Sequence, residues 1–298
     1  MRAGRVCVPP RSWRDYHSKM VVVESLFVYP LKSARGIPKD RVRLSATGFE
    51  WDRHWMATNA QGRFLSQRTH PRLALVETEL TGTALRLRAP GLTPLELPLA
   101  PQGTPAPAQV WKDDCAGLDQ GAEAAAWMSA ALDDSARVVR VPQQIARKAD
   151  PHFAGQGSQQ VSFVDGFPFL ICSTASLAAL NERMPEPIPM ERFRPNIVLT
   201  GLEAFAEDAI DSIHIDGVTL RLVKPCLRCV ITATDQRTGL PGANPLPVLR
   251  TFRFDSTLLG VKFGENAVAA NGVGEEVRRG AECRVTHEAA SAAMPDSG

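Results

Sequence analysis

Residues 212–222 constrain the fold more than any other part of this chain, because they have the pattern of a β-hairpin. Apolar and polar residues alternate on both sides of Asp216-Gly217. Asp-Gly favours a two-residue type I′ turn, whose central residues both need a positive φ. Such a turn pairs apolar residues across the hairpin, namely Ile215 with Val218 and Ile213 with Leu220. The segment therefore predicts two antiparallel strands that present one apolar face.

The second predicted strand runs into a pair of cysteines. Pro225 precedes Cys226 and Cys229, and Lys224 and Arg228 lie beside them. A thiolate is a soft ligand for zinc or molybdenum, and nearby cations favour the ionised thiol. A zinc site needs two more ligands, whereas the other cysteines are scattered singly and no histidine pair has zinc-finger spacing. The pair lies where a strand ends in a loop, a common place for functional groups.

The rest of the chain predicts further β structure with a few helices. Alternating leucines and arginines at 85–88, followed by Leu95 and Leu97, indicate antiparallel strands within a small barrel formed by residues 21–99. Residues 101–108 are proline-rich and predict a connection. Asp119 is a candidate cap for an alanine-rich helix, and a second helix is expected to start near Ser173 or Thr174.

Composition is that of an ordinary soluble protein. A net charge of +2 argues against a nucleic-acid binder, and no apolar run is long enough to span a bilayer. Six unclustered cysteines indicate a reducing compartment, so we expect a cytoplasmic protein. The basic residues 1–19 are expected to be a disordered extension, with an arginine-rich presequence as the alternative and Met20 as a possible true start. Residues 287–298 predict a flexible tail.

Several segments in fixed order resemble the MOSC family, which is named for the C-terminal domain of molybdenum-cofactor sulfurase. The similarity is greatest to the branch that contains the mitochondrial amidoxime-reducing component and its bacterial relatives, and it spans roughly Val21 to Val285. Besides the cysteine loop, the matching motifs are Tyr29-Pro30-Leu31-Lys32-Ser33, Trp51-Asp52-Arg53-His54-Trp55, Gln67-Arg68-Thr69-His70-Pro71-Arg72-Leu73, Ser173-Thr174-Ala175-Ser176-Leu177, Phe193-Arg194-Pro195-Asn196-Ile197 and Phe263-Gly264-Glu265-Asn266. The resemblance implies an α+β, mainly β fold, with an N-terminal β-barrel-like domain over residues 20–135 and a MOSC β-barrel domain over residues 136–286.

The resemblance also implies a molybdenum–pterin cofactor, whose dithiolene chelates the metal while one protein thiolate completes the sulfur ligation. That thiolate maps onto Cys229, for which the alternative is a small buried apolar residue. Cys226 is expected to pack nearby or to be an outer sulfur. Family descriptions add pyridoxal phosphate binding as a further expectation.

The phosphate of the pterin needs hydrogen-bond donors and positive charge. The matching positions expected around the cofactor are Lys32, Ser33, Arg53, Arg68, Ser173, Ser176, Arg194, Asn196 and Arg228. Each position also has a structural alternative. Arg53 and Arg68 would serve equally as surface ion pairs, Ser173 as a helix cap, and Asn196 as a turn residue.

The implied reaction removes oxygen from nitrogen at the metal, with an N-hydroxylated small molecule as substrate. Asp235 is expected either to relay protons near the metal or to cap the turn that follows it. No downstream cluster of four cysteines is present, so electrons are expected from a separate protein of the ferredoxin or flavin/haem reductase type. Two other classes remain open: a cofactor-binding or sulfur-carrier protein, and a thiol-redox protein that uses Cys226 and Cys229.

Overall fold

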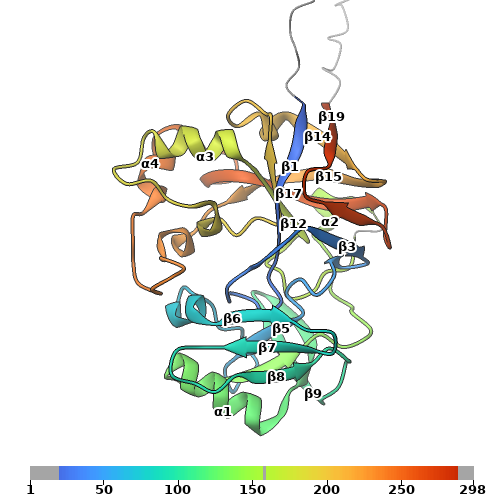
Figure 1. Cartoon of the computed structure of the whole chain (residues 1–298), viewed down its shortest axis with the longest axis vertical. Coiled ribbons are helices and arrows are strands. Elements are labelled where there is room, and N and C mark those ends of the chain that lie inside the picture. The colour runs from blue at the N-terminus through green and yellow to red at the C-terminus, as the bar shows by residue number, and fades with distance from the viewer. Residues whose placement is uncertain (1–19, 157–158, 288–298) are drawn as a thin grey trace, which may run out of the picture.

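The computed structural model describes residues 20–156 and 159–287 and shows a mainly β protein with two bodies (Figure 1). The first and last strands of the chain, β1 and β19, both belong to the upper body in that view, and the helix α1 lies at the base of the lower one. This confirms the expected fold class. The part of the chain that the structure describes contains no helix that is both long and apolar enough to cross a membrane.

The upper body is a barrel, which in the described part of the chain is closed by seven strands. Closure follows from β12, which pairs in parallel with β13 on one side and antiparallel with β17 on the other. The barrel strands are β1 (Val21–Val28), β12 (Phe169–Ser173), β13 (Ile197–Thr200), β14 (Ile210–Ile215), β15 (Val218–Leu227), β17 (Gly260–Asn271) and β19 (Glu282–His287). Two short strands pair with it at the margins, β2 (Ile37–Lys39) with β1 and β16 (Phe254–Asp255) with β17.

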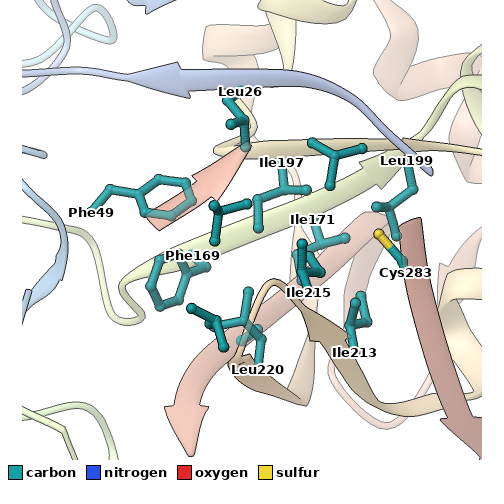
Figure 2. Packing of buried hydrophobic residues seen from close by; sticks show 14 of the residues in the cluster. Leu26, Phe49, Phe169, Ile171, Ile197, Leu199, Ile213, Ile215, Leu220 and Cys283 are labelled. Atoms are coloured by element: carbon teal, nitrogen blue, oxygen red, sulfur yellow. The ribbon is translucent and has the colours of Figure 1, made fainter. Parts of the chain in front are cut away.

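The predicted hairpin forms the β14–β15 pair of this barrel, in the register that the turn required. Ile215 pairs with Val218, and the turn residues Asp216 and Gly217 have φ values of 48° and 82°. The paired apolar side chains Ile213, Ile215 and Leu220 point into the barrel interior, beside Phe169 and below Leu26 (Figure 2). These three and Val218 are almost fully buried, and burial of such a side chain stabilises the fold by about 1.5–3 kcal/mol.

The lower body packs two sheets and a helix around a second apolar core. One sheet has the order β5 (Trp55–Thr58), β11 (Arg137–Arg140), β10 (Asp113–Asp119) and β9 (Thr104–Val110). The other contains β6 (Glu77–Leu80), β7 (Ala84–Arg88) and β8 (Leu95–Pro98), which pair antiparallel as predicted. In this register, Leu85 lies opposite Leu97 and Leu87 opposite Leu95. The helix α1 (Gly121–Leu132) covers this core with residues such as Met128.

Two local predictions for the lower body need correction. Most of the proline-rich connection at 101–108 is strand β9, which pairs along its length with β10. Its prolines are tolerated because β9 lies at the edge of its sheet, where a missing N–H breaks no ladder bond. The cap of α1 is Gln120, although the Asp119 carboxylate does accept a hydrogen bond from the Gly121 amide at 2.8 Å.

Two strands belong to a different body from the one that the predicted domain boundaries assign them to. Strand β1 belongs to the barrel although it precedes the whole lower body, and β11 pairs with β5 although it lies after residue 136. A small fourth sheet in the described part of the chain also joins distant segments. It contains β3 (Arg41–Ser45), β4 (Gly48–Phe49) and β18 (Glu276–Arg278).

Of the remaining elements, η1 (Pro71–Leu75) contributes Leu73 to the core of the lower body, and the others lie in the barrel half of the chain. The α-helices are α2 (Pro151–Ala154), α3 (Thr174–Asn181) and α4 (Pro245–Phe252), and the other 3-10 helices are η2 (Met190–Arg192), η3 (Ala206–Ala209) and η4 (Val230–Ala233). Helix α3 begins where the sequence predicted. Ser173 caps it by accepting a hydrogen bond from the Ser176 amide.

Candidate functional site

A cleft with a volume of about 150 Å³ is lined by residues from segments 32–68, 164–196 and 226–231 and by Asn266. Its walls come from the loops around β5, the loop before β12, the loop before β13 and the cysteine loop after β15. The cleft brings together eight of the predicted site residues: Lys32, Ser33, Arg53, Arg68, Arg194, Asn196, Arg228 and Cys229. Residues 161 positions apart in the sequence are thereby placed in contact.

Cys229 lies just beyond Leu227, the last residue of β15, with Arg228 between them, and forms the N-cap of η4. Its sulfur accepts a hydrogen bond from Arg68 Nη2 at 3.1 Å, and its carbonyl accepts one from the Thr232 hydroxyl. The structure therefore places the partly exposed thiol of Cys229 at the cleft, with a guanidinium beside it. In residues 20–156 and 159–287, no group of three or more metal-ligating side chains gathers, so a metal here would need most of its ligands from elsewhere.

Cys226 has a different environment from Cys229. It packs against the apolar cluster that contains Phe193 and Phe263, and its sulfur accepts a hydrogen bond from Arg228 Nη1 at 2.8 Å. Burial raises the pKa of the Cys226 thiol, and Arg228 opposes that shift. Each thiol of the pair is thus held by its own arginine, and both cysteines are free.

Arg53 and Arg194 form a cationic wall of the cleft. Their guanidinium carbons lie 4.2 Å and 4.4 Å from the ring centre of the buried Tyr29. Arg53 also pairs with the buried Asp52 at 2.5 Å and donates to Asn196 Oδ1 at 3.1 Å. Burial lowers the pKa of Arg194 to about 10, which leaves it protonated at neutral pH.

Lys32 binds the carboxylate of Asp165, which also lines the cleft. Its Nζ is 2.5 Å from Asp165 Oδ1 and donates to the Phe163 carbonyl at 2.8 Å. Burial lowers the pKa of Lys32, and Asp165 opposes this shift. Desolvation alone would raise the pKa of Asp165, but the charges of Lys32 and Arg68 hold it well below its usual range.

The balance of charge in the cleft favours an anion. Among the described residues that line it, five cationic side chains face one carboxylate, that of Asp165. The Nη2 of Arg194 and the Nε of Arg228 are buried and have no hydrogen-bond partner in the described part of the chain. Unsatisfied buried donors are costly, so these groups point to a missing anionic partner.

The backbone is strained at three of the residues in this wall. Ser33, Arg53 and Arg194 adopt left-handed φ values of 66°, 52° and 58°. Such conformations cost about 1–3 kcal/mol each and persist where the surrounding structure enforces them, commonly at functional sites. The strain therefore supports a role in binding for all three.

Three predicted site residues lie outside the cleft lining. Ser173 and Ser176 are fully buried, and their hydroxyls are 2.8 Å apart. Ser176 also donates to the buried carboxylate of Glu207, so this pair is satisfied within the helix cap. Asp235 accepts hydrogen bonds from the Arg237 and Thr238 amides and pairs with Arg192 at 3.1 Å. Asp235 thus caps the turn that follows it, which was the alternative to a role as proton relay.

Two residues of the site, Trp111 and Asp165, carried no recognisable signal in the sequence. Trp111 lies at the β9–β10 turn with its ring 4.6 Å from the Arg68 guanidinium, and its Nε1 donates to Asp165 at 3.1 Å. A single aromatic residue in a turn, such as Trp111, is common, and so is an Asp-Gly pair such as Asp165-Gly166. Only the position of these residues in space therefore reveals a role.

The residues present fit a molybdenum–pterin group. A cleft thiolate beside a guanidinium suits a metal whose other sulfur ligands belong to an organic chelator, and the unpaired guanidinium nitrogens suit its phosphate. Both cysteines of the pair line the cleft, but Cys226 packs against the apolar cluster around Phe193 and Phe263, whereas Cys229 is no member of that cluster.

Comparison with known proteins agrees with this geometry. Residues 20–135 match the MOSC N-terminal beta barrel domain, and residues 158–288 match the MOSC domain. The chain is 33% identical over 275 residues to mitochondrial amidoxime reducing component 2 of Bos taurus, which covers 86% of this chain and 82% of that protein. It is 32% identical over 298 residues to component 2 of Homo sapiens, covering 90% and 87% of the two chains.

A third relative, mitochondrial amidoxime-reducing component 1 of Xenopus laevis, is 32% identical over 252 residues, or 80% of this chain and 73% of its own. The names place these relatives in mitochondria, and the comparisons support neither the expected cytoplasmic location nor pyridoxal phosphate binding for this chain. With both domains matched and this identity over most of each relative, the chain belongs to the MOSC family, together with the mitochondrial amidoxime-reducing components.

Proposed function

We propose that this protein is a molybdenum-cofactor-dependent oxidoreductase that reduces N-hydroxylated compounds. The observation that carries the proposal is the convergence of Cys229 and seven other predicted cofactor residues on one cationic cleft. The names of the relatives, which refer to amidoxime reduction, support the same reaction class.

Within this proposal, each side of the cleft has a separate task. Cys229 would be the protein ligand of the metal, and Arg68 would stay on its sulfur. Arg53, Arg194, Asn196 and Lys32 would bind the phosphate end of the pterin, because Arg53, Arg194 and Lys32 supply positive charge and Arg194 Nη2 is a donor without a partner among the described residues. The bound cofactor would supply two-electron redox chemistry at the metal.

The overall reaction balances with an external donor. The N–O bond of the substrate breaks, and two electrons and two protons convert the N-hydroxy group into an amine and one water. The electrons would come from a separate protein of the ferredoxin or flavin/haem reductase type. The role of Asp235 as a proton relay stays a prediction. Its carboxylate is engaged by the amides of its own turn and by Arg192.

The test is to purify the chain from a host that makes mature molybdenum cofactor and to measure molybdenum, pterin and turnover of N-hydroxylated compounds with a chemical reductant. Near-stoichiometric metal with turnover supports the proposal. Metal and pterin without turnover would favour the cofactor or sulfur carrier. Absence of both, in a host that loads a control molybdoenzyme, would overturn the proposal and favour a Cys226/Cys229 dithiol.

A further inference from the structure

The tip of the β9–β10 hairpin reaches from the lower body to the rim of the cleft. Val110 pairs with Asp113, so Trp111 and Lys112 form the two-residue turn. Trp111 has a left-handed φ of 57° and is 48% exposed. An exposed indole on a strained backbone is costly unless it makes a specific contact, and the contacts of this indole lie toward the cleft.

One face of the indole supports Arg68. The guanidinium carbon lies 4.6 Å from the ring centre, a cation–π geometry, while Nη2 of the same group donates to Cys229 Sγ at 3.1 Å. The Phe64 ring packs edge-on against the indole at 5.0 Å. A guanidinium is planar, so a flat aromatic surface restricts its rotation and leaves its N–H groups aimed at the sulfur.

The indole is itself fixed by polar contacts. Trp111 Nε1 donates to Asp165 Oδ1 at 3.1 Å, and the same carboxylate oxygen binds Lys32. Arg147 joins the hairpin to this loop, since its Nε binds the Asp113 carboxylate at 2.9 Å and its Nη2 donates to the Asp165 carbonyl at 3.0 Å. The hairpin tip is thus tied to the loop that precedes the barrel strand β12.

From these contacts we propose that Trp111 is a positioning residue, which holds the Arg68 guanidinium on the sulfur of Cys229. The lower body thereby controls the charge around a thiol that the barrel supplies. A hydrogen bond from a cation to a metal-bound sulfur withdraws electron density and favours the reduced metal. That last consequence rests on the proposed function, whereas the positioning itself does not.

The positioning can be tested on the full-length, cofactor-free chain by alkylating Cys229 and quantifying its peptide by mass spectrometry. The measured quantity is the ratio of the rates with anionic iodoacetate and neutral iodoacetamide, because this ratio cancels differences in the ionised fraction of the thiol. A guanidinium at this distance should raise the ratio, so Arg68→Ala should lower it by at least about threefold. Trp111→Leu should lower it to a similar extent.

Two controls separate positioning from a general loss of structure. Trp111→Phe keeps an aromatic face and should retain a ratio near that of the wild type. Trp127→Leu removes a tryptophan of the lower body whose Nε1 binds the Thr93 carbonyl away from the cleft, and it should leave the ratio unchanged. An unchanged ratio in Trp111→Leu, with a lowered one in Arg68→Ala, would overturn the proposal.

The loaded protein gives a second, independent readout. The midpoint potential of the metal should shift to a more negative value in both Arg68→Ala and Trp111→Leu, and less in Trp111→Phe. If the alkylation ratios follow the expected order but no variant or wild type binds molybdenum, the positioning is supported and the proposed function fails. If metal binds and the ratios do not change, the proposed function stands and the positioning fails.

Discussion

Arg228 Nη1 lies 2.8 Å from the sulfur of Cys226 and donates a hydrogen bond to it. Nη2 of the same guanidinium donates to the Phe193 carbonyl at 2.7 Å. This arginine therefore spans from one cysteine of the pair to the loop before β13. The two cysteines are close in sequence but are engaged by different partners, and this difference leads to the first prediction.

Replacement of the two cysteines should have unequal effects. We expect Cys229→Ser to reduce turnover by more than about 100-fold, beyond the usual cost of losing an outer contact of a metal site, and Cys226→Ser to reduce it by less than about tenfold. Molybdenum content and steady-state rates, measured on both variants side by side, check this. Equal losses in the two variants would contradict a single-ligand role and favour a dithiol.

Replacement of Arg194 should weaken cofactor retention. Arg194 Nη1 donates to the Ala34 carbonyl at 2.7 Å, which leaves Nη2 free for an anion. Lysine keeps the charge but loses the fork of donors, so Arg194→Lys should lower cofactor affinity by about 10- to 100-fold. Pterin content after dialysis measures it, with the exposed Arg41→Lys as the matched control. Equal retention by both variants would exclude Arg194 from the phosphate site.

The buried Glu265 should make stability depend on pH. Burial, followed by repulsion from Asp208 and Glu207, raises the pKa of Glu265 to about 8, and Oε1 has no partner among the described residues. Between the unfolded pKa near 4.5 and about 8, the unfolded chain releases a proton that the folded chain retains. The contribution of this carboxyl to stability is therefore complete below pH 4.5 and falls as the pH rises to 8, by at most about 1.4 kcal/mol per pH unit.

Glutamine mimics the protonated carboxyl, so the stability gain from Glu265→Gln should grow from pH 5 to pH 8. Urea unfolding of the variant and of the wild type at both pH values measures the difference. Glu186→Gln, at an exposed position, serves as the control and should show little change with pH. A gain from Glu265→Gln that is the same at both pH values would show that this carboxyl does not titrate as described.

The hairpin turn should require glycine at one position. Gly217 has a φ of 82° with no close neighbour in the way of a Cβ, so Gly217→Ala is penalised by conformation alone, and we expect a loss of about 1–2 kcal/mol in unfolding free energy. Gly82, another turn glycine, has no positive φ and open space around it. Gly82→Ala should be neutral or slightly stabilising in the same denaturation experiment, and an equal loss at both sites would disprove the turn argument.

The sequence was informative where the interaction is local. The Asp216-Gly217 turn determines which residues face each other, so the pairing of Ile215 with Val218 was predictable. Ser173 at the start of α3 has the same local character, because a cap needs only the amides of the next turn. Pro105 and Pro107 led to the wrong prediction of a connection at 101–108. Most of that segment is the strand β9, and prolines are compatible with a strand that lies at the edge of its sheet.

The site residues themselves were found through ordered motifs, but their arrangement was not. Nothing local shows that Ser176 would turn inward to Glu207, or that Asp235 would be used by its own turn and by Arg192. In the same way, β1 pairs with β13 although the whole lower body lies between them in the sequence, so no local pattern predicts this contact.

By itself, the sequence determined the mainly β class, the hairpin that ends in the cysteines and the residue types available for a cofactor. Only the tertiary structure decided that Arg68 reaches Cys229, that Arg228 occupies Cys226 and that Trp111 lies over Arg68. The physical reason is the range of the interactions. Turn and cap preferences act over a few residues, whereas these contacts join segments that come together only when the barrel closes and the hairpin docks on it.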